Sequence, residues 1–274
     1  MTLNNQQPSP KILNQAAWSQ FRALATGMGL DPDDPWIGGY VSYEWTHARY
    51  FFEAYARDLE GQRVLEFGCN VGASGIVLAS LGAQVTGVEV DAKFAALAQT
   101  QAEAYGLATR VNVVHVDDTS RMPFPEGHFN LIVCNSVLEY VAPASLAVVQ
   151  KELLRVLKQG GLILVMGTSN RLWPREVHSG RWFSNYLPRG VDALLGGKSL
   201  QRGVSPFTIR NGFPGCLLLD KEDQCATYLA VRKRMGTNAK ALAAMQIAAT
   251  VLSPFAMTVG MVTPSFVMAL RRQS

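Results

Sequence analysis

Two carboxylates stand at the ends of short apolar runs in this chain. Glu66 lies in the run VLEF, directly before a glycine-rich turn, and Glu89 ends the run VTGVE further along. A carboxylate would repel a phosphate, whereas it attracts a ligand with a cationic head. A carboxylate after a second strand also suits the paired hydroxyls of a ribose. Together the two residues predict a nucleoside ligand that carries positive charge and no phosphate.

The turn that follows Glu66 is made of residues that let the backbone approach a ligand closely. Gly68 and Gly72 carry no Cβ atom. Asn70 lies between them, and asparagine is one of the few other residues that tolerate a positive φ. The helix expected after the turn points its N-terminal amides at any bound ligand. We expect Gly68 and Gly72 to contact the ligand, although a purely structural turn uses the same residue types.

Four blocks of sequence resemble the successive motifs of class I S-adenosylmethionine-dependent methyltransferases. In order they are VLEFGCNVG, VTGVEVD, MPFPEGHFNLIVCNSVLEYV and LLRVLKQGGLILV, between about Gly61 and Gly167. The resemblance implies an α/β, Rossmann-like fold with a mostly parallel seven-stranded sheet flanked by helices. It also implies S-adenosyl-L-methionine as the cofactor and S-adenosyl-L-homocysteine as the product. Asn70 departs from the commonest motif, which has a third glycine, but asparagine can hold the same backbone.

The resemblance also implies roles for residues at strand ends. Glu66 would meet the amino group of the cofactor directly or through water, and Glu89 would bind the ribose hydroxyls. Asp117 would accept from the adenine amino group, and Asp118 could do so instead or cap the local turn. The other expected cofactor-lining residues are Cys69, Asn70, Val90, Asn135 and Ser136, of which Asn135 could also be a simple turn former.

Catalysis of methyl transfer depends first on positioning of the acceptor. A general base is needed only if the acceptor must lose a proton during attack. The candidate bases are His178, His47, Tyr43 and Glu44, and His178 is preferred because it follows the fifth expected strand, where the acceptor should arrive. Glu176 would share a face with His178 if that loop were extended. We expect no metal site, because no set of carboxylates and histidines has the spacing of metal ligands.

These residues must be positioned by alternating strands and helices. The expected strands are 63–67, 84–89, 111–115, 131–135 and 162–167, and the expected helices between them are 73–81, 92–105 and 145–157, with Asp91 as an N-cap. Such alternation predicts a parallel sheet covered on both faces. Two further helices, 12–24 and 41–59, are expected before the first strand from their apolar spacing. In the resembled class such helices often form part of a lid over the pocket.

The pattern divides the chain into four segments. Residues 1–60 are expected to form the helical lid, 61–168 the cofactor-binding core, 169–238 a cap for the substrate, and 239–274 a helix and a closing antiparallel strand. The cap segment is loop-rich, aromatic and basic. Its arginines would attract an anionic or lipid-linked acceptor, although each could be ordinary surface charge: Arg171, Arg175, Arg181 and Arg189.

The last segment contains no charged residue from Ala241 to Leu270. One interpretation is peripheral contact with a membrane through residues 241–270. The other is a packed helix followed by a buried strand. Two prolines argue against a single membrane span.

Composition narrows the remaining choices. The 274 residues are 48% hydrophobic, so a sizeable core is expected, and the net charge of +4 is too mild to indicate nucleic acid. The four scattered cysteines are typical of free thiols in a reducing compartment. The N-terminus lacks an apolar signal core, so a cytoplasmic location is expected, with membrane association as an option.

We therefore expect a methyltransferase that acts on a small-molecule or lipid-linked acceptor, with oxygen or nitrogen favoured over carbon. The alternative is a non-catalytic, cofactor-binding partner subunit or scaffold with the same fold. An NAD-dependent enzyme is disfavoured because Glu66 would repel a pyrophosphate.

Overall fold

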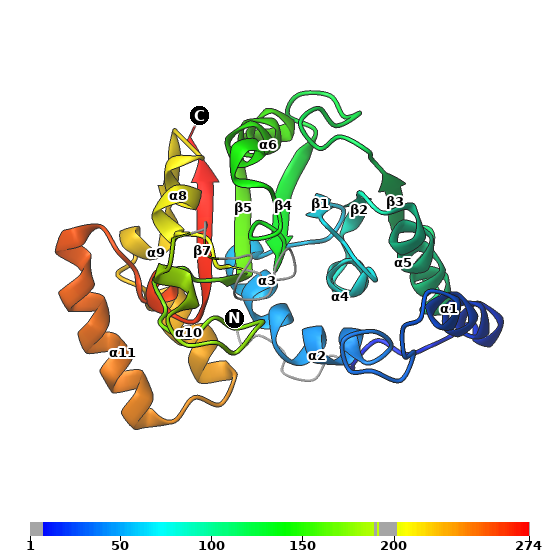
Figure 1. The fold of residues 1–274 in the computed structure, drawn as a ribbon, viewed down its shortest axis with the longest axis horizontal. Helices are drawn as coiled ribbons and strands as arrows, with labels where there is room; N and C mark the ends of the chain where they lie inside the picture. Colours follow the sequence, from blue (N-terminus) through cyan, green and yellow to red (C-terminus); the bar gives the residue numbers. More distant parts are fainter. Residues whose placement is uncertain (1–7, 189–190, 192–201, 274) are drawn as a thin grey trace. The chain divides into compact units, whose positions relative to one another are not determined.

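The computed structural model describes residues 8–188, 191 and 202–273, and these divide into two compact units. The first unit ends at Asp117 and the second begins at Asp118 (Figure 1). Of the arginines expected to attract the acceptor, Arg189 lies outside the described residues.

The first unit contains three parallel strands in the order β3-β2-β1. Its elements are α1 (Gln15–Gly27), α2 (Tyr40–Thr46), α3 (Ala48–Ala56), β1 (Arg63–Phe67), α4 (Ala73–Ser80), β2 (Gln84–Glu89), α5 (Ala92–Ala104) and β3 (Val111–His115). Helix α4 packs on β2, and α5 packs on β2 and β3. In turn α1 packs against α5, and α2 packs against α4 (Figure 1). The carboxyl ends of the strands, where the predicted cofactor residues lie, therefore have α2 and α4 close to them.

Capping residues fix where the helices of this unit begin. The Asp91 side chain accepts from the amide of Lys93 and starts α5, as predicted. The Asn14 side chain accepts from the amide of Ala17, so α1 starts later than the expected residue 12. The predicted helix 41–59 is wrong as a single element. It breaks at His47, whose φ of −125° and ψ of −67° are not helical, and its second half ends at Ala56.

The second unit contains four strands in the order β4-β5-β7-β6. Its strands are β4 (Phe129–Asn135), β5 (Leu157–Ser169), β6 (Cys216–Leu218) and β7 (Ser265–Arg272). Strand β4 is parallel to β5, while β7 is antiparallel to both β5 and β6, which confirms the predicted antiparallel closing strand. Its helices are α6 (Pro143–Val156), η1 (Ser184–Tyr186), α8 (Pro206–Asn211), α9 (Leu219–Glu222), α10 (Ala226–Arg234), α11 (Ala239–Leu252), η4 (Ser253–Phe255) and η5 (Val259–Val262).

Two expectations for this unit need correction. Strands β4 and β5 are longer than predicted, because β5 continues from the end of α6 through Gly160 and Gly161. Among the described residues of the cap segment, the expected loop-rich character holds for 170–188. Residues 206–234 contain three helices and β6, which forms an edge of the sheet, and both β6 and α9 pack against β7.

The predicted fold class is confirmed in the described residues: they form an α/β, Rossmann-like fold of seven strands, mostly parallel, with flanking helices. Apolar side chains fill each unit. Leu65, Ile76 and Leu97 are fully buried in the first, and Phe129, Ile132 and Phe266 in the second.

Candidate active site

The glycine-rich turn after β1 is held almost entirely by its own backbone contacts. The amides of Gly68 and Cys69 both donate to the carbonyl of Val88, and the amide of Gly72 donates to Cys69. The amide of Asn70 donates to Oε2 of Glu89 at 2.9 Å. A phosphate-binding turn must offer free amides to the phosphate oxygens. Four of the five amides from Gly68 to Gly72 are already used, so the turn is poorly suited to a pyrophosphate.

Three residues of this turn adopt the left-handed region, with φ of 70° at Gly68, 48° at Asn70 and 81° at Gly72. Asn70 thus holds the backbone that was expected of it. Gly72 is buried, and a Cβ atom there would lie 3.1 Å from the Cβ of Ala98. The structure therefore gives Gly72 a packing role against α5.

The side chain of Cys69 turns away from the open side of the loop. A Cβ atom on Gly87 would lie 3.0 Å from its sulfur, so the thiol packs on β2. Burial raises the pKa of the Cys69 thiol well above its ordinary value. Any contact of Cys69 with the cofactor must therefore be made by its backbone.

Glu66 belongs to β1, and its side chain is buried against the start of α4. Its carboxyl group accepts from the amide of Gly75 and forms a second hydrogen bond with the Ser74 hydroxyl. Only glycine leaves room for it, because a Cβ atom on residue 75 would lie 2.5 Å from Oε2 of Glu66. Burial, followed by the nearby carboxylate of Glu44, raises the pKa of Glu66 well above its usual range. The carboxyl group of Glu66 thus sits in the interior beside a like charge.

Glu44 reaches this place from α2, which precedes the strands in the chain. Its Oε2 accepts from the Ser74 hydroxyl at 3.0 Å, and the residue is only 3% exposed. Burial and the nearby Glu44 carboxylate also raise the pKa of Tyr40. The structure therefore places Glu44, a predicted candidate base, in one buried cluster with Glu66.

The charge of this cluster fits a cationic ligand. In the described part of the chain, the groups that act most strongly on Glu66 are Glu44, Glu89, the Gly75 amide and the Ser74 hydroxyl, and none of these is a cation. A buried carboxyl beside a second carboxyl, as at Glu66, is costly to ionise unless a positive group joins them. The amino group of S-adenosylmethionine is such a group, so the donor set of the first unit fits that cofactor.

The end of β2 carries the second predicted carboxylate. Oε1 of Glu89 accepts from the amides of Val90 at 2.8 Å and Asp91 at 3.3 Å, in addition to the Asn70 contact of Oε2. The side chain of Val90 is 56% exposed. Glu89 therefore orders the loop around itself while its remaining lone pairs can accept from hydroxyl groups.

The two aspartates after β3 have different surroundings. The Asp117 side chain is 93% exposed and lies 3.4 Å from Nε2 of His115. Asp118 accepts from the amide and the hydroxyl of Ser120, and these hydrogen bonds lower its pKa. Asp118 thus caps a local turn, which was its alternative role, and the free carboxylate is that of Asp117.

In the second unit, a turn after β4 holds Asn135 and Ser136. Ser136 has a φ of 52°, and its amide donates to Met166 of β5. A Cβ atom on Gly167 would lie 2.5 Å from Oδ1 of Asn135, so glycine makes room for this amide side chain. The hydroxyl of Ser136 donates to Oε1 of Glu139 at 3.3 Å.

His178 and Glu139 form a hydrogen-bonded pair in the same unit. Nε2 of His178 lies 3.3 Å from Oε1 of Glu139, whose side chain has no exposed surface. The amide of Ser169 also donates to this oxygen, at 3.1 Å, while Oε2 has no hydrogen-bond partner among the described residues. The hydrogen bond to Glu139 raises the pKa of His178 despite its partial burial. With the Nε2 proton donated to Glu139, Nδ1 of the neutral ring carries the lone pair.

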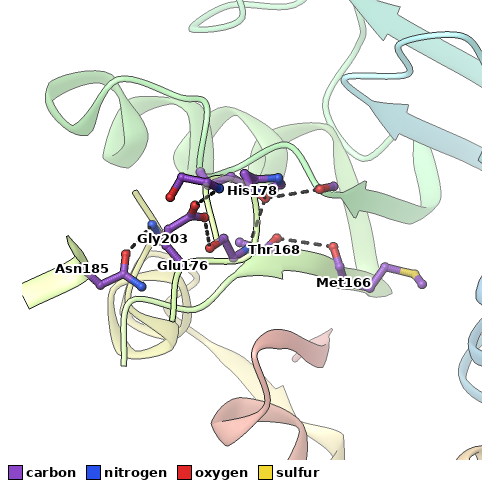
Figure 2. A network of polar contacts seen from close by, with 10 residues as sticks. Met166, Thr168, Glu176, His178, Asn185 and Gly203 are labelled. Carbon is purple, nitrogen blue, oxygen red and sulfur yellow. Dashed lines mark hydrogen bonds and ion pairs between the residues drawn. The ribbon is translucent and has the colours of Figure 1, made fainter. Parts of the chain in front are cut away.

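Glu176 supports the loop that carries His178 (Figure 2). It accepts from the Ser169 hydroxyl at 2.8 Å and from the amides of Ser179 and His178. Burial opposes ionisation of Glu176, but these hydrogen bonds outweigh it and lower its pKa. The loop is a turn wrapped around Glu176, so the extended conformation in which Glu176 and His178 would share a face is not present.

Comparisons with known proteins identify relatives of this chain. Residues 64–161 match the model of the family described as "Methyltransferase domain". A ubiquinone biosynthesis O-methyltransferase of Xanthomonas oryzae pv. oryzae is 28% identical over 191 residues, which cover 69% of this chain and 76% of the relative. Residues 64–161 form a class I S-adenosylmethionine-dependent methyltransferase domain.

Two further proteins, one compared by sequence and one by structure, are similar to this chain. Sterol 4-C-methyltransferase strm-1 of Caenorhabditis elegans is 31% identical over 106 residues, 39% of this chain and 31% of the relative. A solved S-adenosylmethionine dependent methyltransferase from Mesorhizobium loti has a TM-score of 0.51 at 16% identity, covering 83% of this chain and 100% of its own. The latter likeness shows the fold.

The methyltransferase domain and its flanks contain functional candidates that sequence reasoning missed. Glu139 was not selected, although it is a carboxylate inside the apolar run VLEYV, the same signal that pointed to Glu66. Ser169 and Gly75 acquire roles only through contacts that no local pattern predicts. The other candidate bases are less suitable. His47 stacks on Tyr43 with ring centroids 4.1 Å apart, and its Nδ1 contacts the Tyr43 carbonyl.

An exposed aromatic surface lies on the second unit, on the loop after β5. Trp182 stands 6.0 Å from Phe183, and Phe183 stands 6.3 Å from Tyr186, between ring centroids. All three rings are more than half exposed, and the ring of Tyr140 lies 5.6 Å from that of His178. Exposed aromatic groups of this kind offer apolar contact area to a ligand.

Replacing Glu89 with alanine is expected to weaken cofactor binding by ten- to a hundredfold, because a charge-assisted hydrogen bond is lost. Glu89→Gln should retain part of the affinity, since its amide oxygen still orders the loop. Isothermal titration with S-adenosylmethionine measures both variants, with Glu103→Ala on α5 as a control. Equal affinity of Glu89→Ala and the parent protein would exclude Glu89 as a ribose ligand.

Proposed function

We propose that this chain is an S-adenosylmethionine-dependent methyltransferase that methylates an oxygen atom of a small-molecule or lipid-linked acceptor. The observation that supports oxygen is the pair of His178 and the buried Glu139. A hydroxyl acceptor must lose its proton during attack, and a histidine oriented by a carboxylate is suited to remove it. The names of the relatives include an O-methyltransferase of ubiquinone biosynthesis, which also favours this acceptor atom.

When bound, the cofactor supplies a methyl group that its sulfonium has already activated. Glu66 and Glu44 hold the cationic amino group of the cofactor, Glu89 holds its ribose, and Asp117 holds its adenine. Ser136 contacts the same carboxylate as His178, so the predicted cofactor-lining turn and the base share one anchor, Glu139.

In this proposal Nδ1 of His178 takes the hydroxyl proton from the acceptor. Glu139 keeps the ring in one tautomer and stabilises the imidazolium that forms. The aromatic surface of Trp182, Phe183 and Tyr186 binds an apolar or aromatic part of the acceptor. This combination suits a phenol or catechol that carries an apolar chain.

Incubating the protein with S-adenosylmethionine and a panel of phenols, catechols, amines and carboxylic acids tests the proposal. We expect formation of S-adenosylhomocysteine and of a methyl ether with an alkyl-substituted phenol or catechol. Cofactor binding without turnover on any acceptor would instead favour the non-catalytic partner subunit. Methylation of amines alone would refute the oxygen acceptor.

The pH dependence of turnover reports the ionisation of His178. Because Glu139 raises the pKa of His178 and the base must be neutral, activity should increase with pH through that raised pKa. Glu139→Gln removes the negative charge, so the acidic limb of kcat/KM should move to lower pH while the maximal rate falls. A profile measured from pH 5 to 9 in both proteins checks this, and an unmoved acidic limb would contradict it.

A further inference from the structure

Helix α11 is an apolar helix whose surface is mostly open to solvent. Of its fourteen residues from Ala239 to Leu252, Ala249 is the one that is buried. Ile247, Val251 and Phe255 are 66%, 60% and 70% exposed, and they follow one another at intervals of four residues through α11 and η4. Residues at this interval lie on the same side of an α-helix, which places Ile247 and Val251 together, and Phe255 follows them in η4. They form an apolar stripe, defined here as Ile247, Val251 and Phe255.

The opposite side of α11 packs on its own unit. It contacts α10, η4 and η5, and it lies at the outer side of the second unit (Figure 1). The burial of Ala249 on that inner side fixes the rotation of the helix. The apolar stripe therefore faces away from the rest of the second unit, against which α11 packs.

The chain from α10 onward carries charge of a single sign. After Asp223 it contains no acidic residue, and its six basic residues are Arg232, Lys233, Arg234, Lys240, Arg271 and Arg272. Lys240 is exposed in the first turn of α11, and Lys233 is exposed at the end of α10. Lys240 precedes Ile247 by about two turns of α11, so the two side chains lie on the same side of the helix. An apolar helix side that also carries a lysine complements a surface that is apolar inside and anionic outside.

We propose that α11 and η4 bind the surface of an anionic lipid bilayer, with the apolar stripe inserted among the acyl chains and Lys233 and Lys240 at the headgroups. The helix lies along the surface, because fourteen residues extend only about 21 Å. No helix in the described residues has the length and apolar character needed to cross a membrane.

Two other occupants fit less well. A second copy of the chain on the same face would gather Lys233 and Lys240 of both copies at one interface, and their like charges would oppose pairing. Nucleic acid would leave the apolar stripe without a partner. The proposal does not depend on which acceptor is methylated, since it rests on α10, α11 and η4 alone.

Vesicle flotation of the full chain tests this surface. With vesicles of three parts phosphatidylcholine to one part phosphatidylglycerol, we expect the protein to float with the lipid at low salt. It should remain unbound with phosphatidylcholine alone. Ile247→Ser combined with Phe255→Ser should weaken binding by at least about tenfold. Lys233→Gln combined with Lys240→Gln should weaken it by roughly twenty-five-fold, about fivefold for each lysine.

Matched variants of the same unit or of equal exposure serve as controls. Val148→Ser combined with Leu13→Ser replaces other exposed apolar residues, and Lys151→Gln combined with Lys158→Gln replaces other lysines. These controls should bind vesicles like the parent protein. All variants should retain cofactor affinity and circular dichroism, which shows that they fold.

Three results would overturn the proposal. One is equal binding to neutral and anionic vesicles, and another is equal loss in the control variants. The third is a protein that binds no vesicles but forms a dimer without lipid, and whose dimer dissociates in the combined Ile247→Ser and Phe255→Ser variant. That result would assign the surface to a second copy of the chain.

Discussion

Replacement of His178 by alanine is expected to lower kcat by a factor of about 10² to 10⁴, the usual contribution of a general base. The physical reason is the proposed role of Nδ1 of His178 as the proton acceptor, with the ring held by the contact of Nε2 with Glu139 at 3.3 Å. The affinity for S-adenosylmethionine should change little, since the acidic residues predicted to hold the cofactor belong to the first unit. Single-turnover kinetics and titration calorimetry measure the two quantities separately.

The control for this variant is His47→Ala, which removes a partly exposed histidine outside the Glu139 network. Its rate should stay within a factor of two of the parent. Added imidazole should restore part of the activity of His178→Ala, because a small base can occupy the emptied position. Unchanged turnover in His178→Ala would show that the acceptor loses its proton by another route.

Replacement of Glu66 by glutamine should have two opposite effects. Cofactor affinity should fall by ten- to a hundredfold, because the carboxylate that meets the cationic amino group is lost. The midpoint of thermal unfolding without cofactor should rise by about 2–4 °C, which is about 1 kcal/mol for a chain of this size. The gain arises because a neutral amide replaces a buried carboxyl beside Glu44 and can donate to it.

The sign of the pH effect follows from the raised pKa of Glu66. The proton on Glu66 keeps the buried carboxyl group neutral and so favours the folded state. This contribution to stability is fully present below the ordinary pKa of 4.5 and is lost as the pH rises through the raised pKa of the folded state. The stability gain of Glu66→Gln should therefore grow with pH above 4.5, whereas the parent protein loses stability in that range. Scanning calorimetry from pH 4 to 8 checks this. Glu44→Gln is the companion variant, and it should lower the pKa of Glu66 while sparing more of the affinity.

Two outcomes would contradict this account of Glu66. Normal cofactor affinity in Glu66→Gln would remove it from the binding site. A lower midpoint at every pH would show that its hydrogen bonds to Gly75 and Ser74 outweigh the cost of burying it.

Local sequence patterns predicted the central strands well, because polar residues of the candidate site mark where the apolar runs end. Strands β1, β2 and β3 have the predicted bounds, and Asp91 caps α5 as expected. The patterns failed where tertiary contacts decide. The break at His47 and the pairing of β6 with β7 depend on packing that neither apolar spacing nor composition records.

The same limit applies to the candidate site. The sequence marks Glu66 and Glu89 because they interrupt or end apolar runs, but it does not say which neighbours surround them. The association of Glu44 with Ser74 spans thirty positions, and that of His178 with Glu139 spans thirty-nine. Contacts at such separations arise only when the fold brings the elements together.

The buried carboxyls of Glu66 and Glu44 would affect how the protein works in a mixture of cofactor and product. S-adenosylmethionine and S-adenosylhomocysteine share the amino group that these two carboxyls are proposed to bind. The two carboxyls should therefore hold both molecules about equally, which is uniform binding and does not accelerate the chemical step. We expect strong inhibition by the product, so that flux depends on how quickly another activity removes S-adenosylhomocysteine. Glu44→Gln removes the charge of one of the two carboxyls, so it should raise the inhibition constant of the product and the KM of the cofactor by the same factor.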